Sequence, residues 1–278
     1  MRKRHQRKQP SEYLGQAAVL LYSVLVFLPL YVLVTTALKS EKEIYTNPVG
    51  LPAVPQWENF LVAVEKGKIL QYALNSVVVT VIAVILIVVL QTLCSYGLYR
   101  LRGTRLGRLL YSLCIAGLMI PMVGYSSLIL LYRNVGLYNT RTALVIASVA
   151  SSLPFATMIL VGHMKQVPGE LLDAARVDGC SNFQILTKVM VPVIQPAITS
   201  IGVLNLINVW NNMLTPLLLL SDSSKYTIPV GLLSFKGNYS TQYNYLFAGI
   251  IITAIPVLVL YFSSQKKFVE SMTGSIKG

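Results

Sequence analysis

The chain has 278 residues, of which 54% are hydrophobic and only 12% charged, and its mean hydropathy is +0.63. Soluble domains carry about 25% charged residues, so this composition excludes an ordinary soluble enzyme and a disordered protein. The 23 basic residues outnumber the 10 acids, and the three cysteines are too few for a disulfide framework. The high apolar content and the low share of charged residues indicate a membrane protein.

Six long runs contain no Asp, Glu, Lys or Arg, and each is long enough to cross a bilayer as a helix, which takes about 20 apolar residues. In chain order, the runs cover residues 13–38, 69–99, 109–132, 142–164, 189–221 and 237–265. None alternates apolar and polar residues as the strands of a membrane barrel do. The fifth run contains Pro192, Pro196 and Pro216, so we expect part of it to be a surface helix and part a kinked span. We therefore predict an all-α integral membrane protein with six transmembrane helices.

The distribution of basic residues sets the expected orientation. If the N-terminus lies inside, 15 of the 23 basic residues fall in cytoplasmic segments, while the acids divide evenly between the two sides. The positive-inside rule therefore places both termini in the cytoplasm, and nucleic acid is not an expected partner. The expected organisation is a basic cytoplasmic tail over 1–12, a six-helix domain over 13–265 with a cytoplasmic loop at 165–188 and outer loops at 39–68 and 222–245, and a cytoplasmic tail over 266–278.

Several function classes are disfavoured by what the six runs lack. Ion-coupled carriers generally hold ionisable side chains inside the membrane, and these runs have no acid or base, although a sodium site of neutral oxygens leaves that alternative open. The two histidines, His5 and His163, lie in the basic tail and at a membrane edge, so we predict no catalytic residue and no metal site. The sequence also has no phosphate-binding G-x-x-x-x-G-K-[ST] motif. A transport path without its own motor implies a partner that has one.

The cytoplasmic segment 168–192, PGELLDAARVDGCSNFQILTKVMVP, is the most informative part of the chain. Residues 170–177 predict a short helix with two acids in its first turn, where the helix dipole favours them. Gly179 suits the left-handed residue that ends such a helix, and 181–184 fits a capping box that begins a second one. We expect an exposed apolar surface on the first helix, formed by Leu171, Leu172, Ala175 and Val177. The pattern alone fits either a helix resting on lipid headgroups or one that docks into another protein.

This loop resembles the E-A-A-x-x-x-G … I-x-L-P signature of bacterial ABC-importer permease subunits. Asp173-Ala174-Ala175 and Gly179 stand at the matching spacing, and 189–192 ends the pattern, with Asp in place of Glu and Val in place of Leu. The resemblance implies that the short helix docks in a cleft of an ATPase subunit. The residues that we assign to ATPase coupling are Glu170, Leu171, Asp173, Ala174, Ala175, Asp178 and Gly179.

The resemblance extends over nearly the whole chain, to the smaller permease of the maltose/maltodextrin type. It is carried by Trp210-Asn211-Asn212, Pro216-Leu217, TIPVGL at 227–232 and the final Ile276-Lys277-Gly278. It implies a type I ABC importer permease fold in the bacterial cytoplasmic membrane, in a subunit that is not an enzyme and binds no cofactor. The implied partners are a second permease subunit in a heterodimer, two ATP-binding cassette subunits that hold ATP and Mg, an extracellular or periplasmic sugar-binding protein, and membrane lipid. The implied cargo is a sugar, most simply an oligosaccharide, with a polyol or glycerol phosphate as the alternative.

Two further groups of residues are candidates for contact with cargo or partners. In the fifth run, Asn205, Asn208, Asn212 and Thr215 fall on one face of a helix. Because amides facing lipid are costly, this face should meet either another helix or the hydroxyls of a sugar. In the outer loop the resemblance implies contact with the binding protein, for which the candidates are Lys225, Tyr226, Phe235 and Tyr239. The other outer segment, 39–68, is expected to be irregular.

Overall fold

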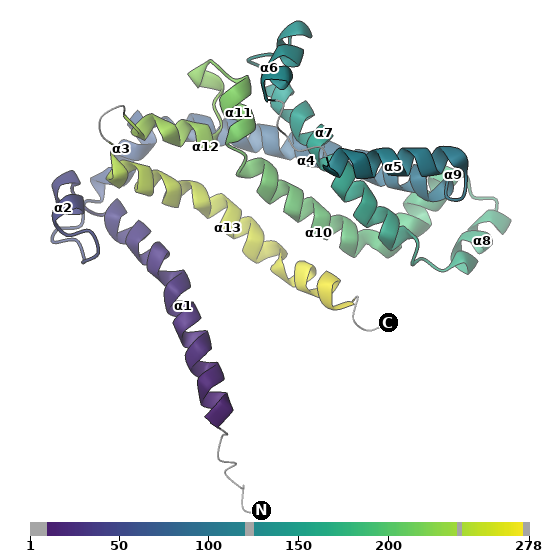
Figure 1. Cartoon of the computed structure of the whole chain (residues 1–278), viewed down its shortest axis with the longest axis horizontal. Helices are drawn as coiled ribbons and strands as arrows, with labels where there is room; N and C mark the ends of the chain where they lie inside the picture. Colours follow the sequence, from purple (N-terminus) through teal and green to yellow (C-terminus); the bar gives the residue numbers. More distant parts are fainter. Residues whose placement is uncertain (1–9, 120–124, 238–240, 275–278) are drawn as a thin grey trace, which may run out of the picture. The chain divides into compact units, whose positions relative to one another are not determined.

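The structure, a computed structural model, describes residues 10–119, 125–237 and 241–274 (Figure 1). These residues are mainly helical, and their only bridge of the β type joins Lys236 and Thr241. The chain divides into two compact units. Unit 1 comprises Met1–Ile69 and Leu232–Ala254, and unit 2 comprises Leu70–Gly231 and Ile255–Gly278.

Unit 1 contains α1 (Pro10–Ala37), α2 (Glu41–Thr46), α3 (Glu58–Lys66), a 3-10 turn (Leu232–Phe235) and the first part of α13 (Tyr243–Gly274). Most of the large apolar side chains of α1 are exposed, as expected for a helix that meets lipid or another subunit. The core of unit 1 gathers Ala37, Ala63 and Ala248 around the ring of Phe235. The expectation that 39–68 is irregular holds for the stretch between α2 and α3, but these two helices occupy half of the segment. The buried amide of Asn59 holds α3 against the end of α1 by donating to the carbonyl oxygens of Ala37 and Lys39 at 2.8 and 2.9 Å.

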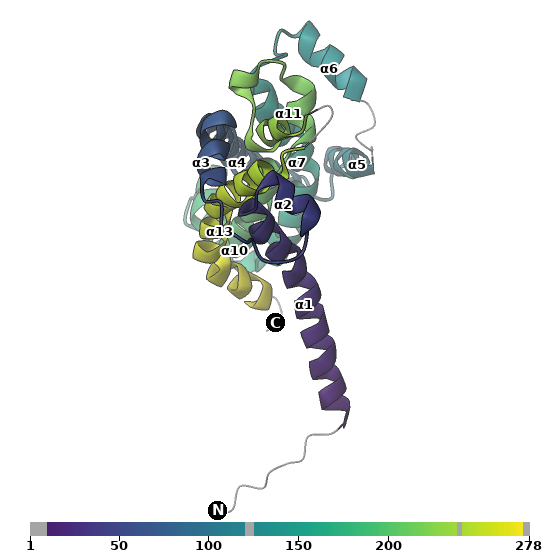
Figure 2. The same ribbon diagram turned by 90° about the vertical axis from the view of Figure 1, so that its left-hand side faces the viewer.

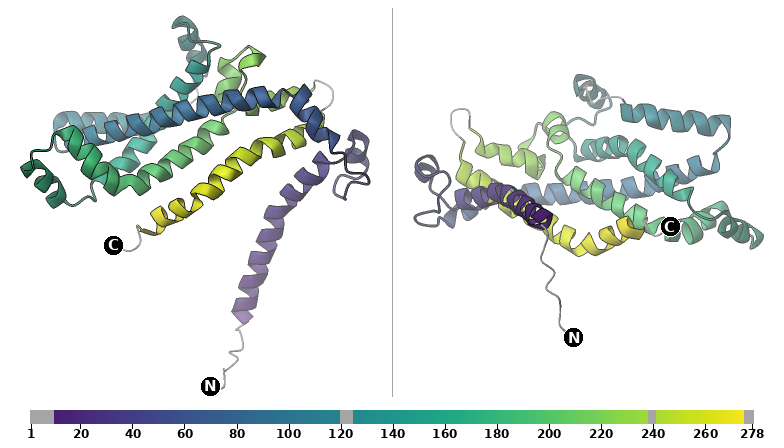
Figure 3. Two further views of the ribbon diagram at one scale, coloured as in Figure 1. Left: turned by 180° about the vertical axis from the view of Figure 1, so that it is seen from behind. Right: turned by 60° about the horizontal axis from the view of Figure 1, so that its bottom comes forward.

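Unit 2 is built mainly from three long helices, α4, α7 and α10, which lie side by side in the views of Figures 1 and 3. Its elements are α4 (Ile69–Arg100), α5 (Arg105–Met119), α6 (Tyr125–Asn134), α7 (Arg141–Met164), α8 (Gly169–Val177), α9 (Asn182–Gln184), a π-helical turn (Ile185–Met190), α10 (Val191–Trp210), α11 (Leu214–Leu219), a 3-10 turn (Ser223–Lys225), α12 (Ile228–Gly231) and the rest of α13. We call the end that carries α8 the α8 end, and the opposite end, which carries α11 and α12, the loop end.

Two apolar clusters stabilise unit 2, one near each end. The cluster at the α8 end includes Met164, Leu172 and Met190, and the cluster at the loop end includes Leu144 and Leu219. Fully burying an aliphatic side chain of this size contributes roughly 1.5–3 kcal/mol. The ends of the long helices are therefore fixed to one another by packing.

Four of the six predicted spans are confirmed as long apolar helices within the described residues. They are Val19–Ala37, Ile69–Arg100, Arg141–Met164 and Asn182–Trp210. The sixth run lies in α13, whose described apolar part is Tyr243–Val259. The single helix expected over 109–132 was wrong, since α5 and α6 are separate helices that run in different directions (Figure 2). The intervening sequence contains Pro121 and Gly124, the two residue types least suited to a helix interior.

The fifth run also differs from the expectation, because its helix begins earlier and ends sooner. A continuous helix runs from Asn182 to Trp210, with a π-helical turn directly before Pro192. In that turn the Val191 N–H donates to the carbonyl of Leu186, five residues back. A proline ring clashes with the carbonyl four residues before it, and the wider turn makes room for the ring without breaking the helix.

Candidate functional site

The short helix α8 has both of its termini defined by local sequence. Glu170 lies in its first turn and Arg176 in its last, each at the helix end whose partial charge it complements. Gly179 ends the helix with a φ of +76°. Its N–H donates to the carbonyl of Arg176 at 3.1 Å, and the N–H of Cys180 donates to the carbonyl of Ala175 at 3.0 Å. These two bonds form a Schellman motif, so the predicted helix and its left-handed terminal glycine are confirmed.

The inner face of α8 is packed into unit 2. Leu172 is 4% exposed and Ala175 is 7% exposed, and both belong to the cluster that contains Met164, Ile185 and Met190. The prediction that Leu172 and Ala175 lie on the exposed surface was therefore wrong. Ala175 faces inward and is part of the packing beneath the helix. The cluster therefore packs α8 against both the end of α7 and the start of the α9–α10 helix.

The outer face of α8 is accessible and carries both apolar and charged groups. Ala174 is exposed, Leu171 is 46% exposed and Val177 is 87% exposed. Asp173 accepts a hydrogen bond from the exposed Arg176 at 2.6 Å, an ion pair of the kind that stabilises a surface helix by less than about 1 kcal/mol. The remaining coupling candidates, Glu170, Asp178 and Gly179, are also exposed. This surface presents a methyl-sized side chain at its centre and charged groups around it.

The connection from α8 into the next helix is short and capped. Ser181 Oγ accepts from the N–H of Gln184, and the Gln184 side chain accepts from the N–H of Ser181 at 2.7 Å. This capping box, which confirms the prediction, begins the helix that continues through α10. Only residues 178–181, from the C-cap Asp178 to the N-cap Ser181, therefore separate two capped helices.

The polar residues of the fifth run do not form one helical face. Because α10 ends at Trp210, Asn212 and Thr215 lie beyond it, and the expected face was wrong in that part. Asn205 is buried, and its Nδ2 donates to the carbonyl of Ile201 within its own helix at 2.9 Å. Asn208 is the one member of the predicted set whose side chain is exposed.

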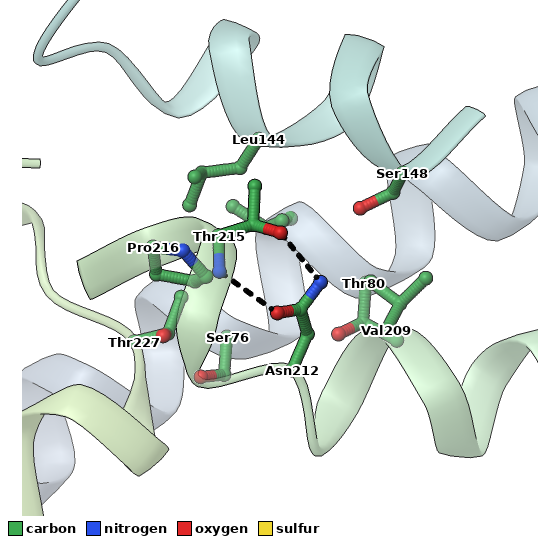
Figure 4. A pocket seen from close by; sticks show the side chains of 10 residues that line it. Ser76, Thr80, Leu144, Ser148, Val209, Asn212, Thr215, Pro216 and Thr227 are labelled. Atoms are coloured by element: carbon green, nitrogen blue, oxygen red, sulfur yellow. Dashed lines mark hydrogen bonds between the residues drawn. The ribbon is translucent and has the colours of Figure 1, made fainter. Parts of the chain in front are cut away.

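Asn212 and Thr215 instead build a local turn at the loop end. The Asn212 side chain donates from Nδ2 to Thr215 Oγ1 and accepts at Oδ1 from the Thr215 N–H, both at 3.1 Å. They line a small pocket with Ser76 and Thr80 from α4 and Ser148 from α7 (Figure 4). The two residues therefore face the interior of unit 2.

Sequence reasoning missed the residues of α4 that fix the loop end. The Asn75 side chain donates to the carbonyl oxygens of Ser224 and Tyr226, both at 2.9 Å, and Ser76 Oγ accepts from the N–H of Ile228 at 2.8 Å. The available signal was an Asn-Ser pair followed by Thr80 within an otherwise apolar run, although the sequence did not show which segment they would meet.

The candidates for binding-protein contact are placed differently from one another. Phe235, one of the predicted contact residues, is 5% exposed and lies in the core of unit 1 instead of on its surface. Tyr226 is half-buried and packs against the ring of Tyr72. Lys225 is half-buried and donates from Nζ to the carbonyl of Asn139 at 3.0 Å. Tyr239 lies outside the described residues.

The exposed part of this loop carries a carboxylate that is held in a turn. Asp222 accepts at Oδ1 from the N–H of Ser224 at 2.9 Å and lies 3.7 Å from Lys225 Nζ. Mainly because of the hydrogen bonds from Ser224, the pKa of Asp222 lies below its ordinary value.

Within residues 10–119, 125–237 and 241–274, no cluster of His, Cys, Asp or Glu has the composition of a metal site.

The chain matches a known family over most of its length. Residues 91–272 match the family described as "Binding-protein-dependent transport system inner membrane component". The diacetylchitobiose uptake system permease protein NgcG of Streptomyces coelicolor is 32% identical over 94% of this chain and 87% of its own length. The arabinooligosaccharides transport system permease protein AraQ of Halalkalibacterium halodurans is 30% identical over 90% and 91% of the two chains.

A solved structure agrees with the fold. A chain from a bacterial ABC transporter involved in the import of the acidic polysaccharide alginate has a TM-score of 0.80 and 21% identity, covering 95% of this chain and 99% of its own. The long apolar helices, the capped helix α8 and these similarities lead to one assignment. The chain belongs to the family of inner-membrane components of binding-protein-dependent transport systems, the permease subunits of ABC importers.

Proposed function

We propose that this chain forms half of the translocation path of an ABC importer for an oligosaccharide, and that α8 couples it to an ATPase subunit. The cargo class is supported by the names of its relatives, one of which takes up diacetylchitobiose and another arabinooligosaccharides. A second permease subunit, two cytoplasmic ATPase subunits that bind ATP and Mg, and an external sugar-binding protein complete the proposed assembly. In this arrangement the α8 end and both termini lie on the cytoplasmic side, as the basic residues indicate.

The observation that carries the proposal is the division of α8 into two faces. Leu172 anchors the helix in the cluster shared by the ends of α7 and α10, while Ala174 is exposed at the centre of the opposite face. A helix anchored in this way transmits force: when a partner bound over Ala174 moves, α8 moves the long helices with it and its own packing stays intact. In this role Glu170, Asp173 and Asp178 orient the partner, and Leu171 provides apolar contact.

Cross-linking with a bulky-substitution series tests the coupling role. In the full importer with its native cysteines replaced, a single cysteine in an A174C variant should form a cross-link to the ATPase subunit. Ala174→Trp should leave assembly intact but reduce uptake per ATP hydrolysed at least tenfold, whereas Ala53→Trp, at another exposed alanine in unit 1, should not. Uptake at the wild-type ratio in Ala174→Trp, together with no ATPase cross-link, would exclude the role.

The proposal also assigns one residue each to the translocation path and to the binding-protein surface. Asn208, the exposed member of the asparagine set, is our candidate for contact with sugar hydroxyls on the path. Asn208→Leu should change the relative uptake of competing oligosaccharides, and unchanged preference would assign Asn208 to packing with the second permease. Lys225 and the exposed loop beside it are our candidates for contact with the binding protein.

Two other functions give different results in the same preparation. A polyol or glycerol phosphate importer would show ATP-dependent uptake of that cargo, with the same requirement for α8. An autonomous ion-coupled carrier would take up substrate as a purified single subunit under an ion gradient, without a response to ATP.

A further inference from the structure

The loop end of unit 2 contains a small, partly open cavity whose lining combines polar and apolar groups. It is lined by residues from α4, α7, the end of α10, α11 and the segment before α12, and its volume is about 10 Å³. One water molecule needs about that volume, and a sugar ring cannot enter it. The lining residues are Ser76, Val79, Thr80, Leu144, Ser148, Val209, Asn212, Thr215, Pro216 and Thr227.

Two hydroxyl groups that line this cavity have no hydrogen-bond partner among the described residues. They are Thr80 Oγ1 and Thr227 Oγ1, on side chains of residues that are 3% and 5% exposed. A hydroxyl buried in this way loses its bond to bulk water without gaining another, which is unfavourable. These unpartnered hydroxyls point to a bound ligand independently of the cavity volume.

The other polar groups nearby are arranged so that a small neutral molecule would be bound. The hydroxyls of Thr80 and Ser148 point toward the Asn212 amide in Figure 4. The Asn212 side chain is fixed by its two bonds to Thr215, which leaves further acceptor capacity on Oδ1. A molecule between these groups can accept from one hydroxyl and donate to the other oxygens.

The charge of the lining selects water over a cation. None of the ten lining residues is acidic or basic. A dehydrated cation would have no counter-charge in this low-dielectric site, whereas a water molecule needs only two to four polar partners.

We infer that the cavity is a binding site for one structural water molecule, held by Thr80, Ser148 and Asn212, that joins α4 to α7 and to the turn after α10. The water satisfies the buried hydroxyl of Thr80. It also accounts for the polar residues at the end of the fifth run: Asn212 and Thr215 serve this joint and do not line the sugar path. The inference concerns packing within this subunit and does not depend on the proposed coupling or cargo.

The direction in which one substitution changes the melting temperature tests the inference. Thr80→Val keeps the shape of the side chain and removes the hydroxyl. In a dry cavity this change removes an unpartnered polar group, so the melting temperature of the detergent-solubilised importer stays equal or rises. In a hydrated cavity it deprives the water of a partner, and we expect a fall of about 2–4 °C. Thr80→Ser, which retains the hydroxyl, should recover part of that fall.

A double-substitution cycle connects the effect to a shared ligand. Ser148→Ala should also lower the melting temperature, and the Thr80→Val/Ser148→Ala pair should lower it by less than the sum of the two, because the first change already releases the water. A cryo-electron microscopy map of the full importer should show a density peak in the cavity that is absent for Thr80→Val.

Three results would overturn the assignment. They are a melting temperature that is unchanged or raised by Thr80→Val, strict additivity of the two substitutions, and a stability that depends on sodium at constant ionic strength, which would indicate a cation. If Thr80→Val fails to assemble, Ser148→Ala and the density peak decide between the same outcomes.

Discussion

The glycine that ends α8 allows the rigidity of this helix, which we propose as the coupling helix, to be tested quantitatively. Gly179 has a φ of +76°, and a Cβ built on it meets no atom within 4 Å. The penalty for alanine is therefore a backbone penalty without a steric contribution, of roughly 1–2 kcal/mol. Asparagine adopts this conformation more readily, so Gly179→Asn should cost less than Gly179→Ala.

A penalty of this size increases the population of the uncapped helix by about 5–30-fold. The affected hydrogen bonds are those donated by the N–H groups of Gly179 and Cys180. Hydrogen exchange measured by mass spectrometry on the assembled importer should therefore show faster exchange at these positions in Gly179→Ala, by up to that factor. Uptake per ATP hydrolysed should fall in parallel, since the helix that transmits the force is loosened rather than removed.

Gly169 provides the matched control in the same helix. It is exposed, a Cβ there also meets no atom within 4 Å, and its φ is not positive. Gly169→Ala should consequently leave both exchange and coupling unchanged. The reasoning would be refuted if Gly179→Ala behaved like Gly169→Ala, or if Gly179→Asn were as disruptive as Gly179→Ala.

Three further predictions concern packing and charge. Leu172→Ala should destabilise the subunit by about 2–5 kcal/mol, because it leaves a cavity in the cluster at the α8 end, whereas the half-exposed Leu171→Ala should cost much less, as read from thermal unfolding of the importer. Gln91 is fully buried in α4, and neither polar atom of its amide has a hydrogen-bond partner among the described residues. Gln91→Met should therefore raise the melting temperature of the importer, and a lower melting temperature would show that the amide is hydrogen-bonded. The folded-state pKa of Asp222 is lowered, so the stabilisation from its bond with Ser224 is present above the ordinary carboxyl pKa and is lost as the pH falls through the lower folded-state value. The loop should therefore become more susceptible to an acid-active protease as the pH falls below the ordinary carboxyl pKa, and Asp222→Asn should remove that dependence.

Much of this protein was predictable from segments read one at a time. Hydropathy over about 20 residues identified the long apolar helices, because crossing a bilayer imposes a length and a composition on each segment by itself. The left-handed Gly179 and the capping box that begins at Ser181 were also predictable. Helix termini are satisfied by side chains and backbone groups within a few residues, so their chemistry is local.

What only the tertiary structure decided is which way side chains face. On α8 the sequence offered Ala174 and Ala175 as equivalent small residues, and packing against α7 and the π-helical turn buried the second and exposed the first. The end of α10 at Trp210 turned Asn212 into the interior, and the core of unit 1 enclosed Phe235. The burial of Ala175 and Phe235 depends on contacts with segments distant in the chain, and local periodicity does not contain these contacts.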